Sequence, residues 1–263
     1  MFPYNLAVPN LLLLLPATLV GLVVGSYLNV VVHRLPRGLS TVRPSSCCPH
    51  CGALVRAFDN IPVVSYLLLG GRCRSCHARI SIRYPLVELA IAGFFVASVL
   101  TFEHPLQAAV AALFCTLMTA LALIDLEHLL LPDKLTLPGI VLGLALQPWI
   151  DHVTLLDAVL GALAGAGVLI LLINFWYWWR EEEGMGLGDV NLLALIGAFL
   201  GWQGVLVALL GGALAGALVG LSLMAFRKLD MASKLPFGTF LALGALVALF
   251  SRGRLVEAYL SLL

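Results

Sequence analysis

The sequence predicts an all-α polytopic membrane protein with about eight transmembrane helices and one small cytoplasmic loop domain. Three observations support this fold class. Of the 263 residues, 61% are hydrophobic and 11% are charged, whereas a soluble domain is about 45–50% apolar. Apolar stretches long enough to cross a bilayer recur along the chain. A single basic segment separates the first stretch from the second, and it contains paired cysteines.

The apolar stretches give the number of spans. A transmembrane helix takes about 17–25 mostly apolar residues, and several stretches are at or below that length, so eight is the best count and seven stays open. Small residues inside the fifth stretch, Gly161 and Gly165 among them, allow neighbouring helices to pack closely. The eight predicted spans cover residues 9–32, 85–102, 106–124, 134–150, 154–179, 187–203, 204–226 and 235–250.

The positive charges predict the orientation. Segment 33–84 holds eight arginines and a single acid, Asp59, and loops this basic stay in the cytoplasm. The N-terminus, which has no basic side chain before Arg34, is then outside. Counting spans onward places residues 125–134 and 180–189 on the cytoplasmic side.

The domain organisation follows from these spans. We expect a first transmembrane span over 1–32, a cytoplasmic loop domain over 33–84 and a transmembrane bundle over 85–263. The formal net charge is +1, and topology explains the basic loop, so nothing indicates a nucleic-acid partner. Membrane lipids are the expected surroundings of the helices.

The loop domain contains two CxxC pairs separated by 21 residues. Two such pairs can surround one tetrahedral ion, which predicts a structural zinc of the zinc-ribbon type. The loop is too small to bury a full core, so a metal would contribute folding energy directly. Reduced or redox-active thiols are the alternative, since disulfides are disfavoured in the cytoplasm. Cys47 could compete as a ligand. The four predicted ligands are Cys48, Cys51, Cys73 and Cys76.

Two carboxylates lie at the edges of predicted spans. Asp125 ends the apolar run 113–124, and Asp189 follows two glycines, Gly186 and Gly188, at the start of another span. Placing a carboxylate at the edge of a membrane segment costs free energy, so such a residue usually has a function. Glycine beside it lets backbone or substrate approach closely. The pattern predicts an aspartyl protease that works in or at the bilayer.

Paired carboxylates suit this chemistry because they cannot both ionise cheaply. One holds a proton while the other acts as a base on water. Asp125 and Asp189 are 64 residues apart, so their meeting depends on tertiary packing. Each also has a plainer interpretation: Asp125 as an interfacial helix end, and Asp189 as the cap of a short helix. Asp133 is best explained as part of a solvated interfacial turn.

Further motifs make the chain resemble the bacterial type IV prepilin peptidase family, the bifunctional leader peptidases and N-methyltransferases of pilus and type II secretion systems. One departure is visible, because the family usually has lysine where this chain has Asn191. The matching motifs are residues 25–31 with 34–36, similar to GSFLNVVIxRLP; residues 59–66, 71–73 and 83–88, similar to the cytoplasmic domain; residues 124–128 with 131–133; and residues 186–189.

The resemblance implies removal of leader peptides from type IV prepilins or pseudopilins at the cytoplasmic face of the bacterial inner membrane. Asp125 and Asp189 would be catalytic, with Gly186 and Gly188 as active-site backbone. It also implies N-methylation of the new terminus from S-adenosylmethionine. No glycine-rich nucleotide-binding loop follows a strand in this sequence, so the N-methyltransferase activity is inferred from the resemblance alone. We expect the loop 33–84 to carry it.

Two other classes of function stay open on the sequence. A non-enzymatic assembly protein could use the loop domain to dock partners and keep the aspartates for structure. A proton-coupled transporter could use buried carboxylates as a proton relay. Transporters often contain internal repeats with sites near the bilayer midplane, whereas no clear repeat is visible here and both aspartates lie near the cytoplasmic boundary.

Overall fold

The computed structural model describes residues 8–150, 153–180, 186–225, 235–251 and 253. The chain forms two compact units, Met1–Thr116 and Leu117–Leu263. Within the described residues the regular elements are helices, together with two isolated antiparallel bridges in the loop domain.

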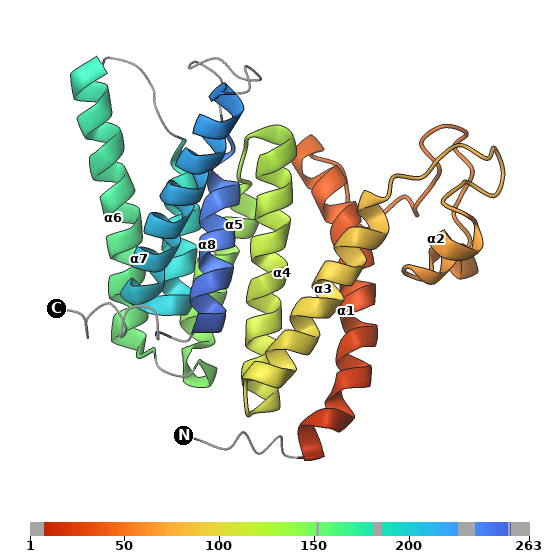
Figure 1. Cartoon of the computed structure of the whole chain (residues 1–263), viewed down its shortest axis with the longest axis horizontal. Helices are drawn as coiled ribbons and strands as arrows, with labels where there is room; N and C mark the ends of the chain where they lie inside the picture. The colour runs from red at the N-terminus through yellow and green to blue at the C-terminus, as the bar shows by residue number, and fades with distance from the viewer. Residues whose placement is uncertain (1–7, 151–152, 181–185, 226–234, 252, 254–263) are drawn as a thin grey trace. The chain divides into compact units, whose positions relative to one another are not determined.

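Unit 1 contains α1 (Val8–Arg34), the 3-10 turns η1 (Leu35–Arg37) and η2 (Ala57–Asn60), α2 (Val64–Leu68), α3 (Arg83–Thr101) and the first half of α4 (Pro105–His128). Helices α1 and α3 lie side by side (Figure 1). Their backbones approach closely at two glycines four residues apart. A Cβ at Gly21 would lie 2.6 Å from the Cα of Ala92, and one at Gly25 would lie 2.7 Å from the Cα of Glu88. Small residues at this spacing are typical of tightly packed membrane helices.

The loop domain between α1 and α3 contains two turns of matching geometry. In the first, the N–H of Gly52 donates to the carbonyl of Cys48; in the second, the N–H of His77 donates to that of Cys73. Gly52 and His77 both have positive φ angles, 70° and 56°. The bridges between Cys47 and Leu54 and between Arg72 and Arg79 close the two turns. Each CxxC pair is therefore held in a turn of its own.

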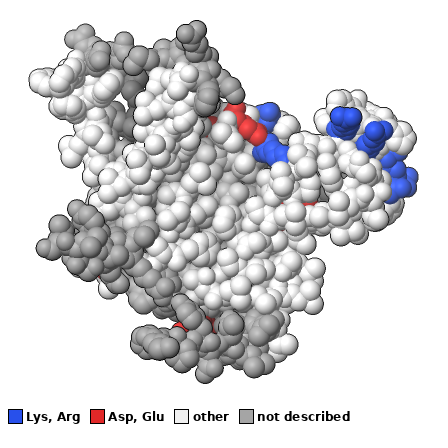
Figure 2. Space-filling model, viewed as in Figure 1, with Lys and Arg blue, Asp and Glu red and all other residues white. Residues whose placement is uncertain are grey.

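Basic side chains are exposed over this loop domain. Figure 2 shows the arginines gathered there, while the visible helical surface is mostly uncharged apart from a small group of acidic and basic atoms near its top edge. This pattern agrees with the charge distribution that predicts a cytoplasmic loop.

Unit 2 contains the second half of α4, then α5 (Asp133–Ala145), the 3-10 turn η3 (Gln147–Trp149), α6 (Leu155–Arg180), α7 (Leu187–Ala225) and α8 (Phe237–Ser251). Helix α7 has 39 residues, which would reach about 58 Å at about 1.5 Å per residue, roughly twice the thickness of the hydrocarbon core. It breaks at Gly201, whose φ of 66° and ψ of −173° are not helical. Glycine accepts this conformation because it has no Cβ.

The two halves of α7 have different partners. Helix α6 packs against the first half, where a Cβ at Gly165 would lie 2.7 Å from the carbonyl oxygen of Leu193. Helix α8 packs against the second half, where a Cβ at Gly244 would lie 2.7 Å from the carbonyl oxygen of Ala208. Both contacts depend on small residues that let helix backbones meet. They bring the first turns of α7 and α8 to the same end of unit 2 (Figure 1).

The chain is a membrane protein, because five described helices are long and apolar enough to cross a bilayer. The count of eight stays a prediction. Helices α5 and α8 have only 13 and 15 residues, and the spans predicted over 187–203 and 204–226 correspond to the two helical halves of α7, which meet at Gly201. The five helices cover Leu12–Arg37, Arg83–Thr101, Pro105–His128, Leu155–Trp179 and Leu187–Ala225.

Candidate active site and metal centre

Asp125 lies in the last turn of α4 and is only 5% exposed. Its Oδ2 accepts hydrogen bonds from the backbone N–H of Thr239, at 2.7 Å, and from the Thr239 hydroxyl, at 3.1 Å. Thr239 belongs to the first turn of α8, where backbone N–H groups have no partner within the helix. The carboxylate of one helix thus caps the beginning of another.

Asp189 lies in the first turn of α7, and its backbone N–H donates to the carbonyl of Gly186 at 3.2 Å. Its side chain is partly buried. The carboxyl groups of Asp189 and Asp125 are close enough to repel one another when both are ionised. The structure therefore brings together two carboxylates that are 64 residues apart in the sequence.

Leu131 packs so closely against two of the glycines near these carboxylates that a larger residue would not fit there. A Cβ at Gly188 would lie 2.9 Å from the Cβ of Leu131, and one at Gly238 would lie 2.8 Å from its Cδ1 and 3.1 Å from Oδ2 of Asp125. Gly186 differs, because a Cβ there would meet nothing closer than 3.9 Å. Gly188 and Gly238 allow close packing, whereas Gly186 contributes its carbonyl group.

A second polar contact joins α5 to α7 beside the aspartates. The amide Nδ2 of Asn191 donates to Oδ1 of Asp133 at 2.9 Å. Asp133 is exposed at the start of α5, as expected for a residue at an interfacial turn. Sequence reasoning missed the role of Thr239, although a signal was present: Gly238 and Thr239 open an apolar helix with a glycine and a polar residue, as Gly188 and Asp189 do.

The four predicted metal ligands form one cluster in the loop domain. Their Sγ atoms all lie within 4.8 Å of one another, and those of Cys48 and Cys76 are 3.8 Å apart. Zinc–sulfur bonds of about 2.3 Å place the corners of a tetrahedron about 3.8 Å apart. The cluster therefore fits a four-thiolate zinc site. Cys47 is not a member of this group.

The thiols of this cluster have unequal acidities. Hydrogen bonds from the backbone N–H groups of Cys51 and His50 lower the pKa of Cys48 to about 6. The Ala78 backbone N–H lowers the pKa of Cys76, but burial and the three neighbouring cysteines outweigh it and raise that pKa to about 11. A bound cation would favour ionisation of the Cys76 thiol, because it would offset the negative charge that forms beside the other cysteines.

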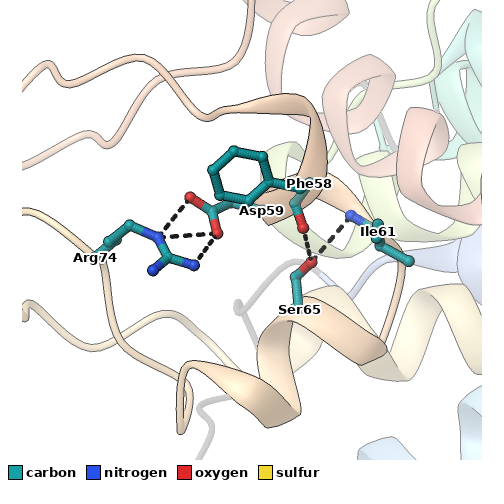
Figure 3. Close-up of polar contacts among 5 residues, drawn as sticks. All are labelled: Phe58, Asp59, Ile61, Ser65 and Arg74. Atoms are coloured by element: carbon teal, nitrogen blue, oxygen red, sulfur yellow. Dashed lines mark hydrogen bonds and ion pairs between the residues drawn. The ribbon is translucent and has the colours of Figure 1, made fainter.

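An ion pair holds the second CxxC turn to the rest of the loop. The guanidinium of Arg74 donates to Asp59 from Nε, at 3.1 and 2.9 Å, and from Nη2, at 2.6 Å (Figure 3). This hydrogen bonding holds the pKa of Asp59 below its usual value. Arg74 also lies over the ring of Phe58, with its Cζ 5.4 Å from the centroid.

Ser65 joins parts of the segment 58–65, and Glu88 connects this segment to α3. The Ser65 hydroxyl donates to the carbonyl of Phe58 at 2.8 Å and accepts from the N–H of Ile61 at 3.1 Å (Figure 3). The N–H of Val63 donates to Oε2 of Glu88 at 2.7 Å. Val63 has φ of 60°, which is uncommon for a β-branched residue. The buried glutamate therefore anchors a strained turn.

Comparison with known proteins gives consistent matches. The model of the bacterial peptidase A24 N-terminal domain matches residues 19–102, and the model of the type IV leader peptidase family matches residues 112–221. The chain is 40% identical to a prepilin leader peptidase/N-methyltransferase of Aeromonas hydrophila, over 92% of each chain. It is 41% identical to one of Burkholderia pseudomallei (strain 1026b), over 93% of this chain and 87% of the relative.

A relative of the same name in Pseudomonas aeruginosa is 40% identical, over 92% of this chain and 91% of its own length. No solved structure matches the chain. The cysteine cluster lies within the part matched by the first family model, and Asp125 and Asp189 lie within the part matched by the second. The chain belongs to the type IV leader peptidase family.

Proposed function

We propose that this protein is a membrane aspartic endopeptidase that removes leader peptides from type IV prepilins or pseudopilins and N-methylates the new terminus. The observation that carries the peptidase assignment is the meeting of two carboxylates, Asp125 and Asp189, at helix ends in unit 2. The names of the relatives support the pairing of peptidase with N-methyltransferase.

In the proposed cleavage the two aspartates share one proton. The ionised carboxylate takes a proton from water as that water attacks the scissile carbonyl, and the protonated partner donates to the carbonyl oxygen. The intermediate then collapses: the first aspartate returns its proton to the leaving amine as the carbon–nitrogen bond breaks, and the second takes back the proton of the hydroxyl that becomes the new carboxyl oxygen. Thr239 contributes by orientation. Its N–H can only donate, so Oδ2 of Asp125 is held as an acceptor, and Oδ1 is left to face the water.

The site is proposed to lie at the cytoplasmic face of the bacterial inner membrane. Asp125 ends a span while Asp189 and Thr239 begin others, so all three share one side of the bilayer. The basic loop 33–84 supports the assignment of this side to the cytoplasm. A prepilin could then keep its apolar helix in the membrane and present its cleavage site at this edge. In this arrangement 1–32 and 85–263 are the membrane parts, and the N-terminus is outside.

Zinc is proposed as the ion of the cysteine cluster. Cys48, Cys51, Cys73 and Cys76 would fill all four positions of a tetrahedron, which is typical of structural rather than catalytic zinc. The ion would neutralise thiolate charge and fix both CxxC turns. The methyl donor is proposed to be S-adenosylmethionine, which supplies an activated methyl group to the free amine that cleavage creates.

One assay tests the peptidase and the transferase together. The full chain, purified in detergent, is incubated with a synthetic prepilin and S-adenosylmethionine, and product masses are measured. We expect loss of the leader and the gain of one methyl group on the mature chain. Prepilin that stays uncut would contradict the proposal and favour an assembly protein or a proton-coupled transporter. A product that is cut but not methylated would contradict only the proposed N-methyltransferase activity.

A further inference from the structure

Unit 1 contains a pocket of about 460 Å³ beside the C-terminal half of α1. One wall comes from α1, and the other walls come from segments 41–46 and 60–62 of the loop domain. Pockets of about 300–1,000 Å³ typically hold small molecules. Its lining combines hydroxyl, amide, aromatic and guanidinium groups with aliphatic side chains. The pocket therefore has the size and mixed polarity of a site for a small polar ligand.

Arg34 is the charged group of this pocket. Its Nη1 donates to the carbonyl oxygens of Ser40, at 3.1 Å, and Pro44, at 2.8 Å. Both partners are neutral, and no carboxylate among the described residues pairs with Arg34. The two bonds fix the guanidinium and use only Nη1, so Nε and Nη2 keep the paired donors that bind a carboxylate bidentately. This arrangement favours a ligand with a carboxylate group.

The remaining lining fits a nucleoside. Tyr27 is 50% exposed, and its hydroxyl is held by Thr41 at 3.2 Å, so the ring has a fixed face for stacking a base. Asn60 lines the same pocket, and an asparagine amide can pair with the N6 and N7 edge of adenine. Ser26 adds a hydroxyl group from α1.

Buried Glu88 stabilises the pocket walls. Its Oε2 accepts a 2.7 Å hydrogen bond from the N–H of Val63, which follows the lining residue Pro62, and its backbone packs closely against Gly25 of α1. One residue of α3 therefore contacts both α1 and the segment that follows Pro62. Walls fixed in this way are characteristic of a preorganised binding site.

We propose that this pocket binds S-adenosylmethionine, with Arg34 holding its carboxylate, Tyr27 stacking on its adenine and Asn60 pairing with the edge of that base. The assignment rests on the proposed function, because the N-methyltransferase activity supplies the ligand. In the transfer, the neutral amine of the cut pilin forms a bond to the methyl carbon. The carbon–sulfur bond breaks with its electron pair on sulfur, leaving S-adenosylhomocysteine, and the amine releases a proton to water.

Binding of the product S-adenosylhomocysteine tests the site without relying on turnover. Isothermal titration is performed with the full zinc-loaded chain in detergent. Arg34→Gln should weaken binding about 10-fold or more, since a hydrogen bond to a charged group contributes about 1.5–3 kcal/mol. Asn60→Leu, which removes a different contact in the same pocket, should also weaken it. Arg43→Gln is the matched control, because Arg43 belongs to the same loop and does not line the pocket.

Zinc content is measured on every variant, and a variant that has lost its zinc is taken to have an unfolded loop domain. Weaker binding in Arg34→Gln and Asn60→Leu, with normal zinc content and an unchanged Arg43→Gln control, supports the site. Unchanged affinity in both pocket variants overturns it, even when the wild-type chain methylates pre-cut pilin. A wild-type chain that neither binds S-adenosylhomocysteine nor methylates pre-cut pilin overturns the transferase function itself.

Discussion

The backbone N–H of Thr239 donates a 2.7 Å hydrogen bond to Oδ2 of Asp125 across 114 residues of sequence. The Thr239 hydroxyl lies 3.1 Å from the same oxygen and 3.0 Å from the carbonyl oxygen of Ala122. A hydroxyl has one proton, so it can donate to only one of these acceptors at a time. The Thr239 hydroxyl can therefore donate to Asp125 when that carboxylate is ionised and to the Ala122 carbonyl when it is protonated. The N–H of Thr239 keeps the carboxylate in place in both states.

Removing this hydroxyl should slow cleavage without weakening substrate binding. Thr239→Val keeps the shape and the N–H but loses the hydroxyl donor, and we expect kcat to fall about 10-fold, in line with one hydrogen bond to a charged group. KM for prepilin should stay within about 2-fold, because Thr239 contacts Asp125. Thr239→Ser restores the hydroxyl and should recover most of kcat. A serine variant as slow as the valine variant would argue against an orienting role.

Each aspartate should be indispensable for cleavage. Asp125→Asn and Asp189→Asn should each reduce prepilin cleavage by about 10³-fold or more, and the double variant should be little worse, because members of an acid–base pair act together. Cleavage is measured by product mass in detergent. Asp133→Asn is the control, since Asp133 is an exposed residue at the start of α5. Near wild-type cleavage in either single variant would show that the pair is not the catalytic one.

The two glycines before Asp189 should respond differently to alanine. A Cβ at position 188 would lie 2.9 Å from the Cβ of Leu131, whereas one at position 186 would meet nothing closer than 3.9 Å. Gly188→Ala should displace the first turn of α7 and reduce activity about 100-fold, as misplacements of about 1 Å do. Gly186→Ala should retain most activity. Equal losses in the two variants, measured in the cleavage assay, would rule out this packing explanation.

The loop domain should contain about one zinc per chain, measured by elemental analysis. Cys48→Ser or Cys76→Ser should lose the metal and make the loop sensitive to protease, because this segment lacks the core to fold alone. Cys47→Ser is the matched control, since Cys47 lies outside the cluster. The membrane helices should stay protected in every variant. A metal-free wild-type loop that resists protease would contradict the zinc assignment.

Cleavage and methylation should be separable. The aspartates lie in unit 2, and the pocket proposed for the methyl donor is lined entirely by unit 1. An Asp189→Asn variant given uncut prepilin should transfer no methyl group, because the acceptor amine has not been released. Given pre-cut pilin and labelled S-adenosylmethionine, the same variant should transfer label at a rate close to that of wild type. Failure with pre-cut pilin, beside an active wild-type control, would mean that the two activities share a site.

Composition and short spacing along the chain are enough to predict several features of this protein. Membrane character follows from apolar length, the basic loop from its arginines and the metal cluster from the two CxxC pairs. The cost of a carboxylate at a membrane edge singles out Asp125 and Asp189 on the sequence alone. The cysteines are predictable as a cluster because each CxxC pair is a local turn with a known preference for a tetrahedral ion.

Which of these groups meet depends on tertiary packing. Nothing local in the sequence brings Thr239 to Asp125 or Leu131 to Gly188, because those contacts depend on how α4, α7 and α8 pack. The break in α7 is similar: glycines are frequent in its sequence, but only Gly201 adopts a non-helical conformation. Periodicity and propensity report on neighbours along the chain, whereas these contacts arise from the close approach of helix backbones far apart in sequence.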